Sequence, residues 1–211
     1  IETITYMLHG EVEHGDSMGN KGVIGPGCAQ WMTAGSGIIH QEMPKGDPNG
    51  RMHGFQLWAN LPASLKMTSP RYQDVKAADV PEVTDDDGTK ARVLCGTFWG
   101  VTGPVDGIAA DPSYVDVWVP PGHKKSLKVA TTRHAFAYVF AGSGQFANAS
   151  PPRDVLTDKI GAWNTPTWEQ AEDRCLVIFD RGDEVTVQAG EQGIRFLLVS
   201  GRPLEEPVAW Y

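Results

Sequence analysis

Residues 26–44 read PGCAQWMTAGSGIIHQEMP, and this stretch determines how the rest of the chain is interpreted. Two strand-like runs flank Gly35-Ser36, a pair whose composition is typical of a turn. His40 and Glu42 stand two positions apart in the second run, so a strand directs both side chains to one face. An imidazole and a carboxylate together suit Fe, Mn, Ni, Cu, Co or Zn. A His-x-Glu pair on a strand also occurs as an ordinary surface or hydrogen-bonded pair, and both interpretations are open at this point.

Short strand-like segments separated by turns recur along the rest of the chain. Glu2 to His14 alternates with the period of a strand, and the 24 Gly and 15 Pro residues are spread without a repeat. Further strands are expected at 28–34, 37–43, 53–61, 92–95, 114–119, 134–140, 175–179, 184–187 and 195–199, with a turn at 141–144 and one short helix candidate at 168–173. Frequent short strands with Gly-rich turns predict an all-β sandwich or barrel. A loose echo between the two halves favours two similar barrels.

A polar segment separates the two halves of this pattern. Residues 64–92 contain two prolines and carry the acidic run Asp85-Asp86-Asp87, which we expect to be a solvated loop, with metal binding as the weaker alternative. The expected organisation is an N-terminal domain over 1–75, a linker with connecting strands over 76–112, and a C-terminal domain over 113–211.

Charge and cysteine usage limit the class of protein. A formal net charge of −8 and a pI of about 5.2 argue against direct binding of nucleic acid, which needs Lys and Arg facing phosphates. No apolar run approaches the roughly 20 residues that cross a bilayer, so no membrane association is expected. The three cysteines form an odd set without a CxxC spacing, which favours reduced thiols in a cytoplasmic protein over disulfides. We expect a monomer.

Several further motifs accompany the stretch at 26–44. They are EH at 13–14, DS at 16–17, GN at 19–20, HGFQLWANLP at 53–62, KM at 66–67, PRYQ at 70–73 and SGRPLEEPV at 200–208. Together they closely resemble the pirin family of the cupin superfamily, densely over residues 2–73 and more thinly between about 80 and 190. The resemblance implies an all-β fold of two tandem cupin (jelly-roll) β-barrels, a bicupin.

The resemblance also implies a mononuclear metal site in the N-terminal barrel. Pirins hold the metal with three histidines and one glutamate, and His40 and Glu42 match two of these ligands residue by residue. The other two belong to an HxH segment just before the part of pirins that matches Ile1-Glu2-Thr3. The chain opens on Ile1 and closes without a polar tail, so we expect both ends to be cut. With half of its ligands, the chain alone is expected to bind Fe²⁺, or another divalent transition metal, weakly or not at all.

Two kinds of function follow from the resemblance. Several bacterial pirin-like proteins are described as having quercetin 2,3-dioxygenase activity, which implies a small aromatic chelating substrate such as a flavonol. In that reading Glu42 is the catalytic base that accepts the flavonol's proton, and His40 is a metal ligand only. Pirins also include non-enzymatic regulators that bind a protein partner under control of the iron's redox state. A third alternative is a cupin whose site has lapsed.

The remaining candidate side chains are expected to be structural. His14 is assigned to turn hydrogen bonding with Asp16, His9 to the surface, and His53 to a structural or surface role. The second half contains His123 and His134 without an HxH or HxE partner, so its barrel is expected to be metal-free. Most of the apolar set near the site is expected to be barrel core, with the lining of an aromatic-ligand pocket as the alternative; the set comprises Trp31, Met32, Phe55, Leu57 and Trp58. Cys28 and Cys95 lack an adjacent base, which disfavours a nucleophilic role.

Overall fold

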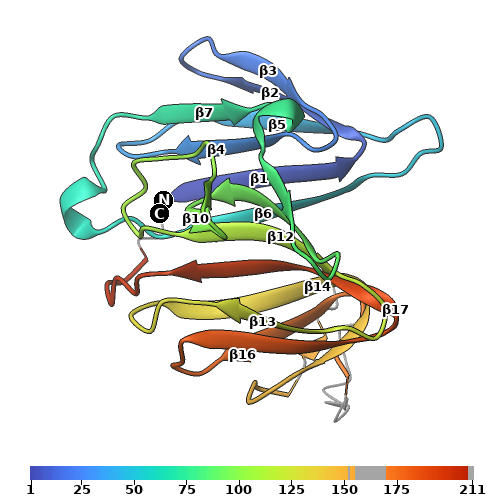
Figure 1. Cartoon of the computed structure of the whole chain (residues 1–211). Helices are drawn as coiled ribbons and strands as arrows, with labels where there is room; N and C mark the ends of the chain where they lie inside the picture. Colours follow the sequence, from blue (N-terminus) through green and yellow to red (C-terminus); the bar gives the residue numbers. More distant parts are fainter. Residues whose placement is uncertain (152, 155–169, 209–211) are drawn as a thin grey trace, which may run out of the picture. The chain divides into compact units, whose positions relative to one another are not determined.

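The computed structural model describes residues 1–151, 153–154 and 170–208, and these are almost entirely β-strands and turns (Figure 1). The only helical segments in these ranges are two short 3-10 turns, η1 (Ala63–Leu65) and η2 (Ala77–Asp79). No helix among the described residues is long and apolar enough to span a membrane. All three cysteines carry free thiols. The all-β class expected from the sequence is confirmed.

Contacts divide the chain into two compact units, which we call unit 1 and unit 2. Unit 1 comprises residues 1–80, 104–110 and the segment from 204 onward, and unit 2 comprises 81–103 and 111–203. These boundaries differ from those expected at 75 and 113. The expected linker, 76–112, contributes strands to unit 2, because Lys90–Cys95 pairs along the strand that begins at Ser113. Hydrogen bonding between strands, which composition does not reveal, decides where unit 2 begins.

Unit 1 contains two antiparallel sheets. A four-stranded sheet has the order β6-β1-β4-β7, and a three-stranded sheet has the order β3-β2-β5. The strands are β1 (Glu2–His9), β2 (Glu11–Asp16), β3 (Lys21–Ile24), β4 (Ala29–Thr33), β5 (His40–Lys45), β6 (His53–Ala59) and β7 (Arg71–Val75). The hairpin of β2 and β3 is seen at the top of Figure 1.

The strand expected from Glu2 to His14 is therefore two strands in different sheets. Gly10 separates them with φ of +74°, a backbone conformation that suits glycine. A Cβ atom on Gly10 would lie 2.7 Å from the carbonyl oxygen of Lys45, so no larger residue fits there without displacing β5. The alternation of the sequence continues across this break, which is why the pattern alone does not reveal it.

Unit 2 is built on an eight-stranded antiparallel sheet. Its order is β15-β16-β14-β17-β12-β9-β8, and β13 also pairs with β17. The strands are β8 (Glu82–Thr84), β9 (Lys90–Cys95), β12 (Ser113–Val119), β13 (Lys124–Lys128), β14 (His134–Phe146), β15 (Arg153–Asp154), β16 (Cys175–Phe179) and β17 (Glu184–Gly201). Two short strands, β10 (Thr97–Phe98) and β11 (Val101–Thr102), form a separate pair.

Two elements of unit 2 are longer than expected. The strands expected at 184–187 and 195–199 are both parts of β17, and β14 continues through the turn expected at 141–144. The register between β14 and β17 shifts twice near Gly142, as it does at a β-bulge, which bends a strand without ending it. Gly142 has φ of +69°, and a Cβ atom there would collide with the carbonyl oxygen of Gly193. The glycines that predicted a turn therefore mark a bend.

The helix candidate at 168–173 lies partly outside the described residues. Trp168 and Glu169 are not described, and Ala171 forms an isolated antiparallel bridge with Gly144. The described part of this segment, from Gln170, is thus not helical.

Buried side chains from nearly every strand form the core of unit 2. Phe196 is fully buried, and its ring lies edge-on to that of Phe146 with 5.2 Å between centroids. The same core cluster contains Val93, Val115, Val117, Val119, Leu127, Val139, Val177, Val187, Ile194 and Leu198. A smaller cluster in unit 1 contains Met7, Val12 and Ile24.

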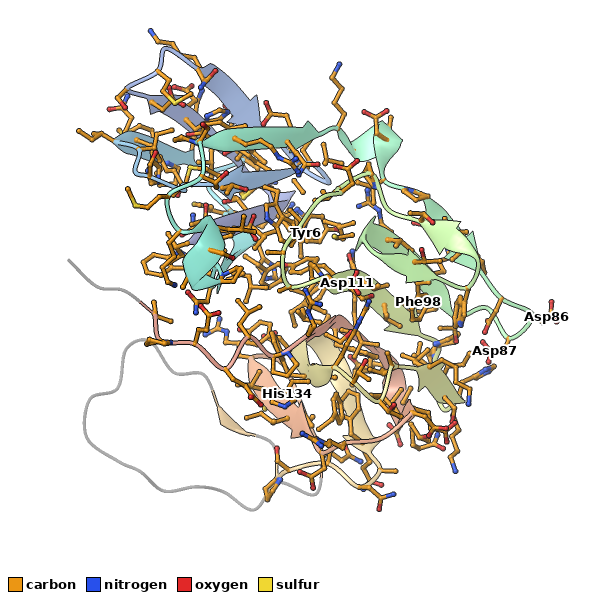
Figure 2. All side chains as sticks on the ribbon, turned by 90° about the vertical axis from the view of Figure 1, so that its left-hand side faces the viewer. Tyr6, Asp86, Asp87, Phe98, Asp111 and His134 are labelled. Atoms are coloured by element: carbon orange, nitrogen blue, oxygen red, sulfur yellow. The ribbon has the colours of Figure 1, made fainter. Side chains whose placement is uncertain are left out.

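The acidic run lies in the loop between β8 and β9, where Figure 2 shows Asp86 and Asp87 at the tip. Only Asp86 is exposed. The ammonium group of Lys125 contacts the carboxylates of both Asp85 and Asp87 and lies 5.2 Å from the centre of the Trp99 ring. The run is therefore a loop whose charge is partly neutralised, and the expectation of a fully solvated loop is wrong for Asp85 and Asp87.

Lys125→Met is expected to lower the free energy of unfolding of unit 2 by about 1–3 kcal/mol, because it leaves two half-buried carboxylates without their shared cation. Chemical denaturation of both proteins measures the difference. Lys128→Met is the matched control, since Lys128 is largely exposed where it pairs with Glu184 and such pairs contribute at most about 1 kcal/mol. Equal losses for the two variants would contradict a special role for Lys125.

Candidate metal centre

Strand β5 carries His40 and Glu42 on one face of the three-stranded sheet. In the antiparallel pairing of β5 with β2, Glu42 lies opposite His14 and His40 lies opposite Asp16. The same face carries Val12, which is only 5% exposed, so it is the face turned towards the interior of unit 1. Both candidate ligands thus start from the inner face of this sheet.

The carboxylate of Glu42 reaches the other sheet of unit 1. Its two oxygens accept hydrogen bonds from Nε2 of Gln56 on β6, at 2.8 and 3.0 Å. The same Nε2 lies 3.3 Å from Oγ1 of Thr5, and Oε1 of Gln56 accepts a hydrogen bond from Nε1 of Trp58 at 2.9 Å. Glu42 is therefore held in one orientation by a chain of hydrogen bonds.

His40 differs from Glu42 in its surroundings. It is the first residue of β5 and is exposed, whereas Glu42 is half-buried. Ile39, next to it, is 80% exposed, so the chain enters β5 from solvent. We expected both side chains to converge inside a barrel; they share a face, but the imidazole of His40 is open to solvent.

A second group of polar side chains surrounds His14 on the same inner face. Nε2 of Gln30, a buried residue of β4, lies 2.8 Å from Nε2 of His14 and 2.8 Å from Oδ1 of Asp74. Because an amide nitrogen only donates, this contact assigns Nε2 of His14 as the acceptor and the ring proton to Nδ1. His14 therefore bonds across to β4, and the expected turn hydrogen bond with Asp16 is wrong.

Glycine at position 22 leaves room for this histidine. A Cβ atom on Gly22 would lie 2.5 Å from Nε2 of His14. On its other side the imidazole stacks on Tyr72 of β7, with 6.0 Å between ring centres. The neighbouring strands thus fix the ring of His14 on the inner face opposite Glu42.

Asp16 ends β2 and organises the turn that follows. Its Oδ1 accepts from the backbone nitrogens of Met18 and Asn20 at 2.8 and 2.9 Å, and its Oδ2 accepts from Nδ2 of Asn20 at 2.6 Å. Desolvation opposes ionisation, but these hydrogen bonds outweigh it and lower the pKa of Asp16 from 3.8 to about 2. Burial, followed by the hydrogen bond to Asp16, raises the pKa of Tyr72 above its ordinary value, so its hydroxyl stays protonated.

The pKa of Asp16 predicts how acid affects unit 1. Because the pKa is lower in the folded chain than in the unfolded one, the carboxylate stabilises the fold above about pH 4, and this stabilisation is lost as the pH falls towards 2. Asp16→Asn is expected to weaken the pH dependence of the unfolding midpoint in that window, measured by denaturation at stepped pH. Ser17→Ala is the control and should keep the original profile. An unchanged profile in Asp16→Asn would exclude this carboxylate as a source of acid sensitivity.

The apolar set near the site is divided by the structure. Trp31 and Met32 on β4 are buried, as expected for core residues, and Phe55 and Leu57 are half-buried. Trp58 is 56% exposed and is therefore not a core residue. It lies on β6, which is an edge strand among the described strands of this sheet.

The other two histidines of unit 1, His9 and His53, lie on β1 and β6. His9 is exposed, as expected, and faces His53 across β1 and β6 with 6.4 Å between ring centres. His53 is half-buried and packs edge-on against Phe55. In unit 2, both His123 and His134 are exposed.

The donors present fit part of a metal centre. His40 and Glu42 offer a nitrogen and a carboxylate oxygen from one face, the kinds of ligand that divalent transition metals take. Within the residues that the structure describes, no group of three or more His, Cys, Asp or Glu side chains is arranged to hold a metal ion. The two residues therefore account for two ligand positions and leave the others to be supplied.

Sequence reasoning missed the residues that hold the candidate ligands in place. Gln56, Gln30 and Tyr72 come from β6, β4 and β7, and they meet β2 and β5 only after two sheets have assembled. Gln56 and Trp58 both lie in the motif at 53–62. They stand two positions apart, so a strand would place their side chains on one face, and this spacing is the signal that could have identified them. A cavity of about 400 Å³ in unit 1 includes neither His40 nor Glu42 in its lining, which comprises Glu13, His14, Gly15, Lys21, Gly22, Val23, Gln41 and Met43.

Two family models and a series of known proteins match the sequence of this chain. The family model described as Pirin matches residues 1–59, and the Pirin C-terminal cupin domain matches residues 114–211. A pirin-like protein of Caulobacter vibrioides is 42% identical over 211 residues, which cover 100% of this chain and 68% of the relative.

Solved structures of related proteins also match this chain. The crystal structure of quercetin 2,3-dioxygenase from Acinetobacter baumannii matches with a TM-score of 0.81 and 31% identity, covering 100% of this chain and 67% of that one. A bacterial pirin from Escherichia coli, solved in complex with nickel(II), matches with a TM-score of 0.67 at 21% identity, over 96% of this chain and 72% of that one, and shows the shared fold. The cupin β fold is therefore confirmed.

Proposed function

This chain belongs to the pirin family, and from that premise we propose that it is a metal-dependent quercetin (flavonol) 2,3-dioxygenase with a mononuclear metal in unit 1. The observation that carries the proposal is the shared inner face of His40 and Glu42, together with the two hydrogen bonds that fix the carboxylate of Glu42. A cytoplasmic location, favoured by the cysteine usage, is part of the proposal.

The metal would be held by a ring nitrogen of His40 and a carboxylate oxygen of Glu42, with further ligands completing the set. Fe²⁺ or another divalent transition metal suits these donors. When bound, such an ion acts as a Lewis acid that lowers the pKa of a coordinated hydroxyl group.

The residues around the site suit a flat, chelating substrate. Trp58 is 56% exposed, and its indole is an aromatic surface of the kind on which a flat ring packs. Glu42 accepts the proton of the flavonol's 3-hydroxyl group while Gln56 keeps the carboxylate oriented. His40 binds the metal and moves no proton.

Loss of the flavonol absorbance tests the proposed activity. The purified gene product, loaded separately with Fe²⁺, Ni²⁺ or Co²⁺, is incubated with quercetin in air, and a metal-dependent decrease is expected. Glu42→Gln should abolish it. Glu13→Gln is the control, because Glu13 is an exposed residue of the same sheet and lies opposite Met43 in the pairing of β2 with β5. This variant is expected to retain activity. No metal-dependent loss in the unmodified protein would exclude the activity.

The net charge of −8 favours one alternative use of the same site. A non-enzymatic, iron-dependent regulator would present this acidic surface to a basic patch of a protein partner. Capture from native lysate with oxidised and with reduced protein tests it. One partner retained in a single redox state supports regulation, and identical capture in both states contradicts it.

A further inference from the structure

We propose that Gln56 and Trp58 are positioning residues that fix the carboxylate of Glu42, so that it is presented to the metal in one orientation. The role towards the metal rests on the proposed function. The hydrogen-bond chain itself does not depend on it.

The chain of hydrogen bonds runs from the surface of unit 1 to the candidate ligand. Nε1 of Trp58 donates to Oε1 of Gln56 at 2.9 Å, and Nε2 of Gln56 donates to both oxygens of Glu42 at 2.8 and 3.0 Å. Trp58 and Gln56 stand two apart on β6 and therefore share one of its faces. Glu42 approaches them from β5, in the other sheet.

The chemistry of the two ends permits one orientation of the amide. The indole of Trp58 is a donor only, and an ionised carboxylate is an acceptor only. If the amide of Gln56 were flipped, its nitrogen would face the indole N–H and its oxygen would face the carboxylate, and both contacts would be lost. The orientation of Gln56 is thus set by Trp58 at one end and by Glu42 at the other.

A carboxylate held in this way is prepared for binding a metal. Ligating carboxylates are commonly hydrogen-bonded by an outer partner, and removing such a partner lowers metal affinity roughly 10–100-fold. Gln56 is placed to be that partner. Trp58 acts through Gln56, to which it donates a hydrogen bond. Because Trp58 is 56% exposed, substituting it should alter the site with little effect on the core.

The first test follows Gln56 without any metal. In the ¹⁵N-labelled full chain, solvent exchange of the side-chain amide protons of Gln56 is measured by NMR, and Gln56→Leu assigns the signals. Trp58→Phe keeps the ring and removes the donor, and it is expected to speed exchange roughly 3–10-fold, as loss of one ordinary hydrogen bond does. Trp118→Phe, in unit 2, is the matched control and should leave the rate unchanged. Equal rates in the original protein and Trp58→Phe would overturn the proposal.

The second test uses Co²⁺ alone as the probe, titrated into the full gene product. Gln56→Leu is expected to raise the Kd roughly 10–100-fold and Trp58→Phe by a smaller factor, while Gln41→Leu, on the opposite face of β5, leaves it unchanged. If Gln56→Leu binds Co²⁺ like the original protein while His40→Ala does not, the positioning role is wrong and the metal site stands. If the original protein binds no Co²⁺, the metal site is wrong and the role of Gln56 towards a metal is wrong with it. The exchange measurement alone then decides whether Trp58 fixes the amide.

Discussion

Substitution of His40 by alanine is expected to raise the Kd for Fe²⁺ of the gene product by more than roughly 100-fold, beyond the usual cost of losing an outer hydrogen-bond partner. The variant removes the only nitrogen ligand that β5 offers. It should cost little stability, because His40 is exposed at the start of the strand. Anaerobic titration of Fe²⁺ against a competing chelator measures the change.

Two controls make this result specific. His9→Ala removes another exposed histidine of unit 1, one that stacks on His53, and should leave the Kd unchanged. Denaturation of His40→Ala should give the same unfolding midpoint as the original protein. If His40→Ala binds Fe²⁺ with its original affinity, β5 does not carry the metal site.

Phe196→Ala is expected to cause the largest loss of stability, about 3–5 kcal/mol, because it leaves a cavity in the core of unit 2. Phe196 is fully buried, and its ring packs edge-on against Phe146. A loss of this size is a large part of the roughly 5–15 kcal/mol that stabilises a typical domain. The variant should therefore unfold near physiological temperature or fail to accumulate.

Chemical denaturation followed by tryptophan fluorescence measures this loss. The chain has two units, so the transition of unit 2 is analysed on its own rather than assuming a single step for the whole chain. Glu191→Ala, an exposed position of the same strand, is the control and should change stability by less than about 0.5 kcal/mol. A loss below 1 kcal/mol in Phe196→Ala would mean that this core relaxes around the cavity.

The all-β fold class could be predicted from the sequence, because strand-like runs and turn residues are recognised within short segments. The strands predicted at 28–34 and 114–119 are those that the structure places at β4 and β12, with small shifts at their ends. The bend in β14 was read as a turn, because Gly142 and Gly144 suit both, and only the pairing with β17 distinguishes them. Short strands such as β8 lack a pattern of their own and form because a neighbour offers an edge.

The candidate site was predictable to the same extent. His40 and Glu42 follow from spacing within one strand, since residues two apart share a face. Their partners are non-local: Gln56 lies 14 residues from Glu42 in sequence and belongs to another sheet. The hydrogen bond of His14 to Gln30 likewise requires two sheets to meet, and the nearer Asp16 gave a plausible but wrong local partner.

The central claim is that His40 and Glu42 bind one metal ion from the inner face of unit 1. Anomalous diffraction from crystals of the gene product soaked in Ni²⁺, collected at the nickel absorption edge, tests it most directly. The prediction is a peak at roughly 2.0–2.2 Å from a ring nitrogen of His40 and a carboxylate oxygen of Glu42, the usual length of such bonds. A strong peak within bonding distance of other residues, with no peak near His40 or Glu42, would contradict it.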